Sequence, residues 1–197
     1  MGFDHIDVAY CTQKGIKVAY VPTYGAHTVA EHAFALLLSI SRKIIPSSIK
    51  AKEGEFANEE FTGFDLFGKT IGILGTGNIG KNVAELSLAF GMKVLAFSHS
   101  QDQELVAKGV RYVDLNELLV NSDIISLHLP HTKETEHIIN MQNIQNIKKG
   151  AVLINTARGS LIETQAIVEG LERKILSFVG LDVLEEECDL REERELL

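Results

Sequence analysis

Six residues in the middle of the chain, Gly75-Thr-Gly77-Asn-Ile-Gly80, have the spacing of a loop that binds a pyrophosphate. The apolar run TIGIL leads into this GxGxxG motif and the helical pattern NIGKNVAELSLAF leads out of it, which is the context that the motif requires. Gly75 then permits a tight turn, Gly77 lets the backbone approach the phosphates, and Gly80 lets the helix pack closely on the strand. The helix N-terminus adds N–H donors and the positive end of its dipole. The motif predicts a dinucleotide site, against the alternative of a plain glycine turn.

The residue expected to bind the adenosine ribose departs from the usual pattern. A dinucleotide site places an aspartate or glutamate at the end of the second strand, about 20 residues further on. Here the apolar run KVLAF ends at Ser98, which can accept a ribose hydrogen bond but does not repel a 2′-phosphate. Residues 98–104 contain no lysine or arginine to bind that phosphate, and we expect Asp102 to be an exposed loop acid rather than a ribose ligand. NAD is therefore the predicted cofactor, and NADP stays open.

These residues need a sheet to position them, and the sequence predicts an α/β doubly wound parallel sheet of the Rossmann type, because short β-branched runs alternate with helical patterns. The predicted strands are 70–74, 93–97, 123–127, 151–155 and 177–182, and the predicted helices are 79–90, 115–121, 140–147 and 164–173. Ahead of them, residues 1–22 predict a short helix and then a strand stopped by Pro22. Residues 28–42 predict a long apolar helix, and the polar residues 46–66 a surface excursion.

Composition excludes several classes of protein. With 197 residues and 45% hydrophobic content the chain can form a packed core, and its net charge of −8 argues against nucleic acid as a partner. No apolar stretch approaches the ~20 residues of a membrane helix, and no signal-peptide pattern is present. Cys11 and Cys188 offer neither a disulfide framework nor a metal pair, which predicts a cytoplasmic protein. His27 and Glu31 have helical i, i+4 spacing but no third ligand, so no metal site is expected.

Five motifs, in order along the chain, closely resemble the D-isomer-specific 2-hydroxyacid dehydrogenases, in particular the D-lactate dehydrogenase branch of that family. The motifs are GFDHIDVAYC near the start, YGAHTVAEHAFALLL (24–38), DIISLHLPHTKETEHIIN (123–140), KKGAVLINTARGSLIE (148–163) and GLDVLEEE (180–187). The resemblance implies an NAD-dependent oxidoreductase that interconverts a 2-oxo acid and a D-2-hydroxy acid by hydride transfer.

The resemblance also implies roles for individual residues. Arg158, directly after the run AVLIN, would hold the substrate carboxylate bidentately and polarise the carbonyl. Glu187 matches the catalytic glutamate that pairs with a general-acid histidine and raises its pKa, with Glu185 and Glu186 as close rivals. Asp182 would contact the nicotinamide end of the cofactor, the alternative being a cap for the following turn. Further cofactor contacts fall on Asn78, Ile79, Leu129, Pro130, Thr135, Thr156 and Ala157, and Tyr24 falls at the substrate-facing hinge position.

One element of the family's pattern is missing. The catalytic histidine of the family follows the glutamate in a strand-then-Pro-His segment, and this sequence reaches Leu197 without one. His128 and His131 lie nearest to the predicted crevice, but we expect each to be structural or solvent-facing. Residues 1–23 are interpreted as a remnant of the substrate domain, and 24–197 as a hinge helix with a dinucleotide domain that is incomplete at its C-terminal end. The sequence therefore predicts a fragment truncated at both ends, with impaired turnover.

Two other interpretations stay open. One is a non-catalytic NAD(H)-binding interaction protein, and the other is a decayed fragment that does not fold stably. The family resemblance implies a small-molecule 2-oxo or 2-hydroxy acid as substrate and a homodimer formed through the dinucleotide domain and the helix at 28–42. Neither nucleic acid nor membrane is an expected partner.

Overall fold

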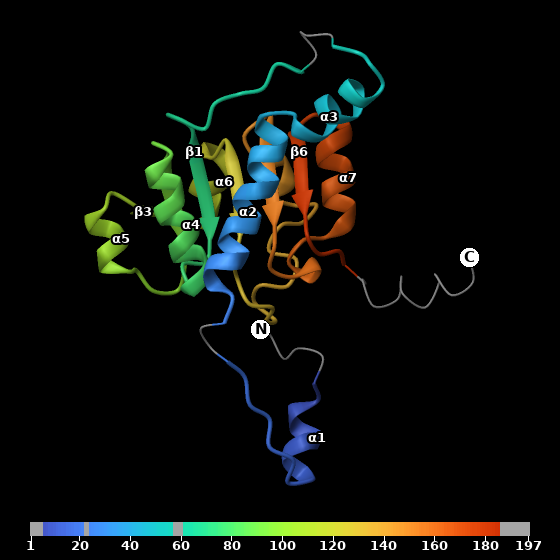
Figure 1. Ribbon diagram of the computed structural model, residues 1–197. Helices are drawn as coiled ribbons and strands as arrows, with labels where there is room; N and C mark the ends of the chain where they lie inside the picture. The colour runs from blue at the N-terminus through green and yellow to red at the C-terminus, as the bar shows by residue number, and fades with distance from the viewer. Residues whose placement is uncertain (1–5, 22–23, 57–60, 186–197) are drawn as a thin grey trace.

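A six-stranded parallel sheet organises the chain (Figure 1). The computed structural model describes residues 6–21, 24–56 and 61–185. The sheet has the order β3-β2-β1-β4-β5-β6, and every strand pairs in parallel with its neighbour. Its strands are β1 (Thr70–Leu74), β2 (Lys93–Phe97), β3 (Arg111–Tyr112), β4 (Ile124–Leu127), β5 (Ala151–Asn155) and β6 (Leu176–Leu181). The strand order reverses between β1 and β4, and in open α/β sheets that point is where ligands bind.

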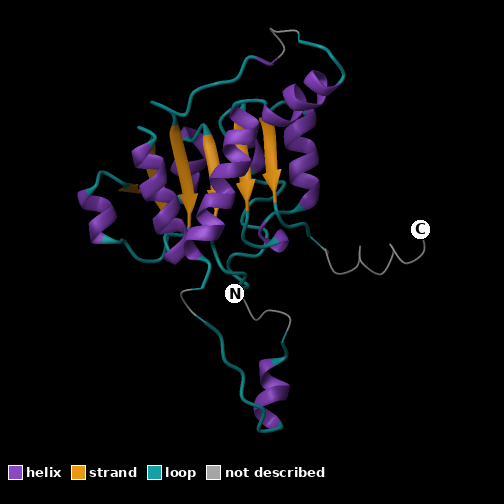
Figure 2. Cartoon of the chain, in the orientation of Figure 1, coloured by secondary structure: helices purple, strands orange, loops and turns teal. Residues whose placement is uncertain are grey.

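Helices cover both faces of the sheet (Figure 2). On one face α2 (Ala26–Ser41) packs against α4 (Asn78–Ala89) and against β5 and β6. On the other face lie α6 (Leu115–Asn121) and α7 (Thr164–Glu172). Two buried apolar clusters result, one between the sheet and α2 with α4, the other between the sheet and α6 with α7. The strands are apolar on both sides because both faces are covered.

Most predicted elements are confirmed. β1, β2, β5 and α6 have the predicted bounds, and α2, α4, α7, β4 and β6 differ from them by one or two residues at an end. The doubly wound fold is therefore correct. The structure adds three elements that the sequence did not indicate: α3 (Ile44–Lys52), α5 (Gln103–Ala107) and the short strand β3. The stretch from residue 46 thus begins as a helix, not as an irregular excursion.

The predicted helix at 140–147 is wrong. Only a 3₁₀ turn, η2 (Ile144–Asn146), forms there. The side chains of Asn140 and Asn143 bond the local backbone instead: Asn143 Nδ2 donates to the Ile138 carbonyl at 2.7 Å, and Asn143 Oδ1 accepts from the Asn140 N–H at 3.0 Å. Asparagine side chains that satisfy the backbone in this way compete with helical hydrogen bonding.

The amino-terminal segment matches its prediction in part. The short helix is present as α1 (Val8–Gln13), capped by the Asp7 carboxylate, and none of its residues is buried. Residues 16–21 do not form the predicted strand, and Ile16, Val18 and Tyr20 are exposed. A strand needs a neighbour to pair with, and no strand of the described sheet pairs with this segment, which lies apart from the sheet in Figure 1.

Candidate functional site

The glycine loop lies between the carboxyl end of β1 and the start of α4. Gly75 has φ +96°, and its N–H donates to the Phe97 carbonyl at the end of β2 at 2.8 Å. A Cβ on Gly80 would stand 1.8 Å from the Gly75 carbonyl oxygen, so only glycine lets α4 approach the loop this closely. A Cβ on Gly77 would meet nothing within 4 Å. Gly75 and Gly80 are thus required by the fold itself, whereas the space at Gly77 is open to a ligand.

The residues around this loop fit a dinucleotide. Gly77 is the N-cap of α4 and has no side chain to cap the first helical turn, which contains Asn78 and Ile79. At the carboxyl ends of β4 and β5, the buried atoms Thr156 Oγ1, His128 Nδ1 and His131 Nε2 have no hydrogen-bond partner among the described residues. A buried polar atom without a partner costs about 1–3 kcal/mol, so these atoms call for a polar partner. A phosphate over the loop and polar groups of a nucleotide further along the crevice would supply partners of this kind.

The turn that carries Arg158 is held from both sides by Asn155. The Asn155 side chain accepts from the Ala157 N–H at 3.0 Å and donates to the Arg158 carbonyl at 2.8 Å. Arg158 is half-buried, and its Nη1 donates to the Ala157 carbonyl at 2.7 Å. Asn155 is almost fully buried at the end of β5, so it fixes the turn to the sheet. A guanidinium at this edge can bind a carboxylate.

The chain that leaves β6 passes directly over this turn. A Cβ on Gly159 would stand 2.0 Å from the Leu184 carbonyl oxygen. The next residue, Glu185, accepts the N–H of Thr164 at 2.8 Å and its hydroxyl at 2.6 Å, and it also pairs with His137 Nε2. Burial alone would raise the pKa of Glu185, but these hydrogen bonds outweigh it and lower the pKa below its usual range. Glu185 therefore holds the start of α7. Glu187, for which Glu185 is a close rival in the sequence, lies outside the described residues.

Asp182 follows β6 and pairs with a residue that the sequence did not suggest. Its N–H donates to the Asn155 carbonyl at 3.0 Å, and its carboxylate lies 3.3 Å from Nε2 of His32 on α2. Both side chains are about half exposed. Asp182 thus stands at the carboxyl edge of the sheet. Within the described residues, its side chain does not cap the following turn. No local signal in the sequence could pair residues so far apart.

The loop after β4 is held together by Thr135. Its hydroxyl donates to the Pro130 carbonyl at 2.6 Å and accepts from the Thr132 N–H at 2.8 Å. Thr135 and Leu129 are buried, whereas Pro130 is exposed. Thr135 thus shapes the loop around Pro130 and Leu129, the three cofactor contacts that the sequence assigned to this segment.

His128 of this loop does not have the properties of a cationic acid. Nε2 of His128 lies 2.8 Å from the Ser126 hydroxyl, and burial lowers the pKa of His128 to about 4. The imidazole is therefore neutral at pH 7. His131 is half-buried with its Nε2 enclosed. Both are close to the predicted crevice, and both are built into the loop.

On the adenosine side, the structure corrects the prediction for Asp102. Its carboxylate caps α5, accepting from the N–H groups of Glu104 at 2.8 Å and Leu105 at 3.2 Å. It also lies 2.9 Å from Nζ of Lys81 on α4. Its side chain is only 25% exposed, so it is not the free loop acid that the sequence suggested. Ser98, half-buried at the end of β2, is close by in the chain.

A second group missed from the sequence joins two loops at this edge of the sheet. The Tyr112 hydroxyl donates to Thr76 Oγ1 at 3.0 Å and accepts the Asp102 N–H at 3.0 Å. Thr76 stands between the first two glycines of the loop, so Tyr112 fixes the loop after β2 to the glycine loop. β3, which carries Tyr112, is two residues long and gives too short a pattern to be recognised.

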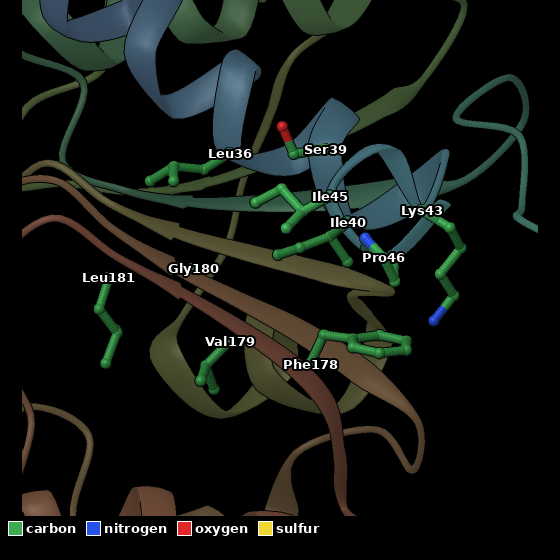
Figure 3. Close-up of a pocket in the computed structure, with 10 residues that line it drawn as sticks. All are labelled: Leu36, Ser39, Ile40, Lys43, Ile45, Pro46, Phe178, Val179, Gly180 and Leu181. Carbon is green, nitrogen blue, oxygen red and sulfur yellow. The ribbon is translucent and has the colours of Figure 1, made fainter. Parts of the chain in front are cut away.

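An apolar groove of about 360 Å³ lies elsewhere, between the end of α2, the start of α3 and β6 (Figure 3). Leu36, Ile40 and Phe178 line it, and the Lys43 ammonium stands 3.6 Å from the centre of the Phe178 ring. Its lining is mostly apolar, and Ser39 and Lys43 are the polar side chains among its lining residues. Among the described residues, no helix is long and apolar enough to cross a membrane, and no three metal-binding side chains are grouped.

Comparison with known proteins agrees with this geometry. Residues 34–197 match the family described as D-isomer specific 2-hydroxyacid dehydrogenase, NAD binding domain. D-lactate dehydrogenase of Escherichia coli is 39% identical over 189 residues, covering 96% of this chain and 57% of that protein. Hydroxypyruvate reductase of Thermotoga maritima is 42% identical, covering 95% of this chain and 60% of that protein. The crystal structure of D-lactate dehydrogenase from Aquifex aeolicus, complexed with NAD and lactic acid, aligns with a TM-score of 0.92 and 43% identity over 99% of this chain and 59% of that one. The chain thus spans somewhat more than half the length of the relatives it matches.

Proposed function

We propose that this chain is the cofactor-binding part of an enzyme interconverting a 2-oxo acid and a D-2-hydroxy acid. The chain belongs to the D-isomer-specific 2-hydroxyacid dehydrogenases and matches the NAD-binding domain of that family. The observation that carries the proposal is the glycine loop, whose Gly77 leaves open space at the N-terminus of a helix. The cofactor of the family is NAD, which supplies or accepts the hydride when it is bound.

The residues of this chain bind and orient the reactants. Gly77 and the first turn of α4 hold the pyrophosphate, because backbone N–H groups at a helix N-terminus attract anions. Thr156 and Asp182, at the carboxyl ends of β5 and β6, line the nicotinamide end. Arg158 holds the substrate carboxylate and polarises the carbonyl, so that hydride transfer to the carbonyl carbon is favoured.

The proton for the new hydroxyl group must come from a general acid. We assign this role to the histidine that pairs with the glutamate matching Glu187 in the family. His128 is unsuited to that role, because its lowered pKa of about 4 leaves it neutral at pH 7. We therefore propose that the 197 residues alone turn over slowly. Loss of a general acid costs on the order of 10²–10⁴-fold in rate.

An NADH titration of the chain, followed by cofactor fluorescence, tests the proposal most directly. Saturable NADH binding that is lost in a Gly77→Ala variant supports it, and absence of NADH binding contradicts it. In a full-length version, Arg158→Ala should abolish reduction of the oxo acid and spare NADH binding. Arg173→Ala is the matched control, because the Arg173 side chain pairs with Glu169 at the exposed end of α7.

We also propose a homodimer. Ile44, Ile45 and Ile49 of α3 are each about half exposed or more, and an apolar helix face of this kind is typical of an interface. Sedimentation velocity measures the state of association, and a monomer at micromolar concentration contradicts the dimer. The same apolar surface also fits the non-catalytic alternative, an NAD(H)-binding interaction protein. NADH binding without turnover in a full-length version would favour that alternative.

We place the protein in the cytoplasm, which the absence of any disulfide pattern in the sequence supports. The substrate is proposed only as a class, the small 2-oxo and 2-hydroxy acids.

A further inference from the structure

Lys81, the residue that follows the last glycine of the loop, has its ammonium group occupied by two carboxylates. Nζ lies 2.9 Å from Oδ2 of Asp102 and 2.6 Å from Oε2 of Glu104. The hydrogen bonds that Lys81 donates to these acids raise the pKa of Lys81 above its usual range and lower the pKa of Asp102. One lysine and two acids thus form a cluster with a formal charge of one net negative.

This charge cluster stands where the adenosine half of a dinucleotide would lie. The Gly75 N–H donates to the Phe97 carbonyl, which directly precedes Ser98. Tyr112 links Thr76 of the glycine loop to the Asp102 N–H. In dinucleotide-binding folds, the residue after the second strand meets the ribose 2′-hydroxyl, or the 2′-phosphate in the case of NADP. Ser98 holds that position here, four residues before Asp102 of the cluster.

We propose that Asp102 and Glu104 set the cofactor preference of this chain by occupying Lys81, so that NADH is accepted and NADPH is rejected. This inference rests on the proposed function, since it requires NADH to bind at the glycine loop. Ser98 carries no charge that could repel a 2′-phosphate, whereas the two acids do. They also neutralise the lysine that would otherwise attract the phosphate, because an ammonium paired with carboxylates offers little net charge to a third anion.

The test measures the dissociation constants of NADH and NADPH by cofactor fluorescence for the 197-residue chain and its variants. The wild-type chain should bind NADPH at least tenfold more weakly than NADH. The double variant Asp102→Asn, Glu104→Gln should bind NADPH at least tenfold more tightly than wild type, with NADH affinity within twofold of wild type. Asparagine at 102 keeps the cap of α5, because asparagine caps helices as well as aspartate does.

Two controls separate this mechanism from a general charge effect. Glu85→Gln removes one carboxylate from another ion pair between α4 and the α5 region, with Lys108 at 2.5 Å, and should change NADPH affinity by less than twofold. Lys81→Met, added to the double variant, should remove most of the gain in NADPH affinity and leave only the part that comes from the lost repulsion by the two acids. If the double variant is unstable, Glu104→Gln alone replaces it. This variant leaves the Asp102 cap of α5 unchanged and alters a side chain that is 73% exposed. It should give a smaller gain of the same sign.

Three results would overturn the inference: equal affinity of the wild-type chain for the two cofactors, unchanged NADPH affinity in the double variant, or a gain that Lys81→Met does not diminish. If NADH binds and NADPH affinity does not respond, only this inference fails. If neither cofactor binds any variant, the proposed function fails and the inference fails with it. Raising the salt concentration should reduce the gain, because dissolved ions screen the attraction between Lys81 and the 2′-phosphate.

Discussion

Gly159 and Leu184 are in backbone contact: a Cβ built on Gly159 would stand 2.0 Å from the Leu184 carbonyl oxygen and 2.1 Å from its carbonyl carbon. The turn after Arg158 and the chain that leaves β6 are thus fitted to each other at the level of the main chain. Glu185, the next residue, is fixed in turn by Thr164 and His137. The position of Arg158 therefore depends on a segment that comes 25 residues later.

A methyl group at this contact should disturb both segments. We expect Gly159→Ala to lower the free energy of unfolding by about 1–3 kcal/mol, the usual cost of overpacking a rigid site. Urea unfolding at pH 7 measures the change. Ser160→Ala, one residue further, should stay within about 0.5 kcal/mol of wild type. Equal stability of Gly159→Ala and wild type would show that the two segments can separate freely.

Gly77 and Gly80 should respond to the same substitution in opposite ways. Gly80→Ala places a Cβ 1.8 Å from the Gly75 carbonyl, so the fold should lose about 1–3 kcal/mol. Gly77→Ala meets no protein atom and should cost at most about 1 kcal/mol, through the weaker N-cap. NADH binding should nevertheless be lost in Gly77→Ala, because the methyl group would project toward the pyrophosphate. Normal NADH affinity of this variant would show that the pyrophosphate does not bind at the glycine loop.

His128 should make the stability of the protein depend on pH. Its folded pKa of about 4 is below the ordinary value of 6.5, so the unfolded chain binds a proton that the folded chain refuses. Its stabilising effect is complete above pH 6.5 and is lost as the pH falls toward 4. At about 1.4 kcal/mol per pH unit, the loss between pH 7 and pH 5 is about 2 kcal/mol.

Urea unfolding of wild type and His128→Gln at pH 7 and pH 5 isolates this effect, because carboxylates with lowered pKa contribute only at still lower pH. The wild-type chain should lose about 2 kcal/mol more than the variant over this range. Parallel losses in the two chains would mean that another group titrates.

Tyr112→Phe tests the link between the two loops of the crevice. The variant removes both hydrogen bonds of the hydroxyl, to Thr76 and from Asp102, at a cost of about 1–2 kcal/mol. NADH affinity should fall severalfold, because the glycine loop is then less well ordered. Calorimetric titration and thermal unfolding measure the two effects. Tyr10→Phe, on the exposed face of α1, is the control and should change neither quantity.

The sheet and the glycine loop were predictable because their signals are local. Runs such as TIGIL and AVLIN are apolar over a whole strand, and the GxGxxG spacing reflects contacts within six residues. The helix predicted at 140–147 failed because two asparagine side chains satisfy the backbone there. The strand predicted ahead of Pro22 failed because a strand exists only with a neighbour.

The site was predictable in its positions but not in its pairings. The sequence places Arg158 and Asp182 at the ends of successive strands, and the structure has them there. The partners of Asp182 and Glu185, which are His32 and His137, lie 150 and 48 residues away in the chain. Asp102 was misjudged for the same reason, since Lys81 comes from another helix.

The packing of α2 also bears on how this protein can be cut. Ala30 and Ala33, in the first half of the helix, are buried in the same apolar cluster as Ile71 and Ile73 of β1. The family match begins at Phe34, in the middle of the helix. An expression plasmid designed from that boundary would discard half of a helix that the core depends on, and we expect its product to be recovered in inclusion bodies. Gly25, with φ +74° at the helix N-cap, is the better place to start a minimal domain for crystallisation or NMR.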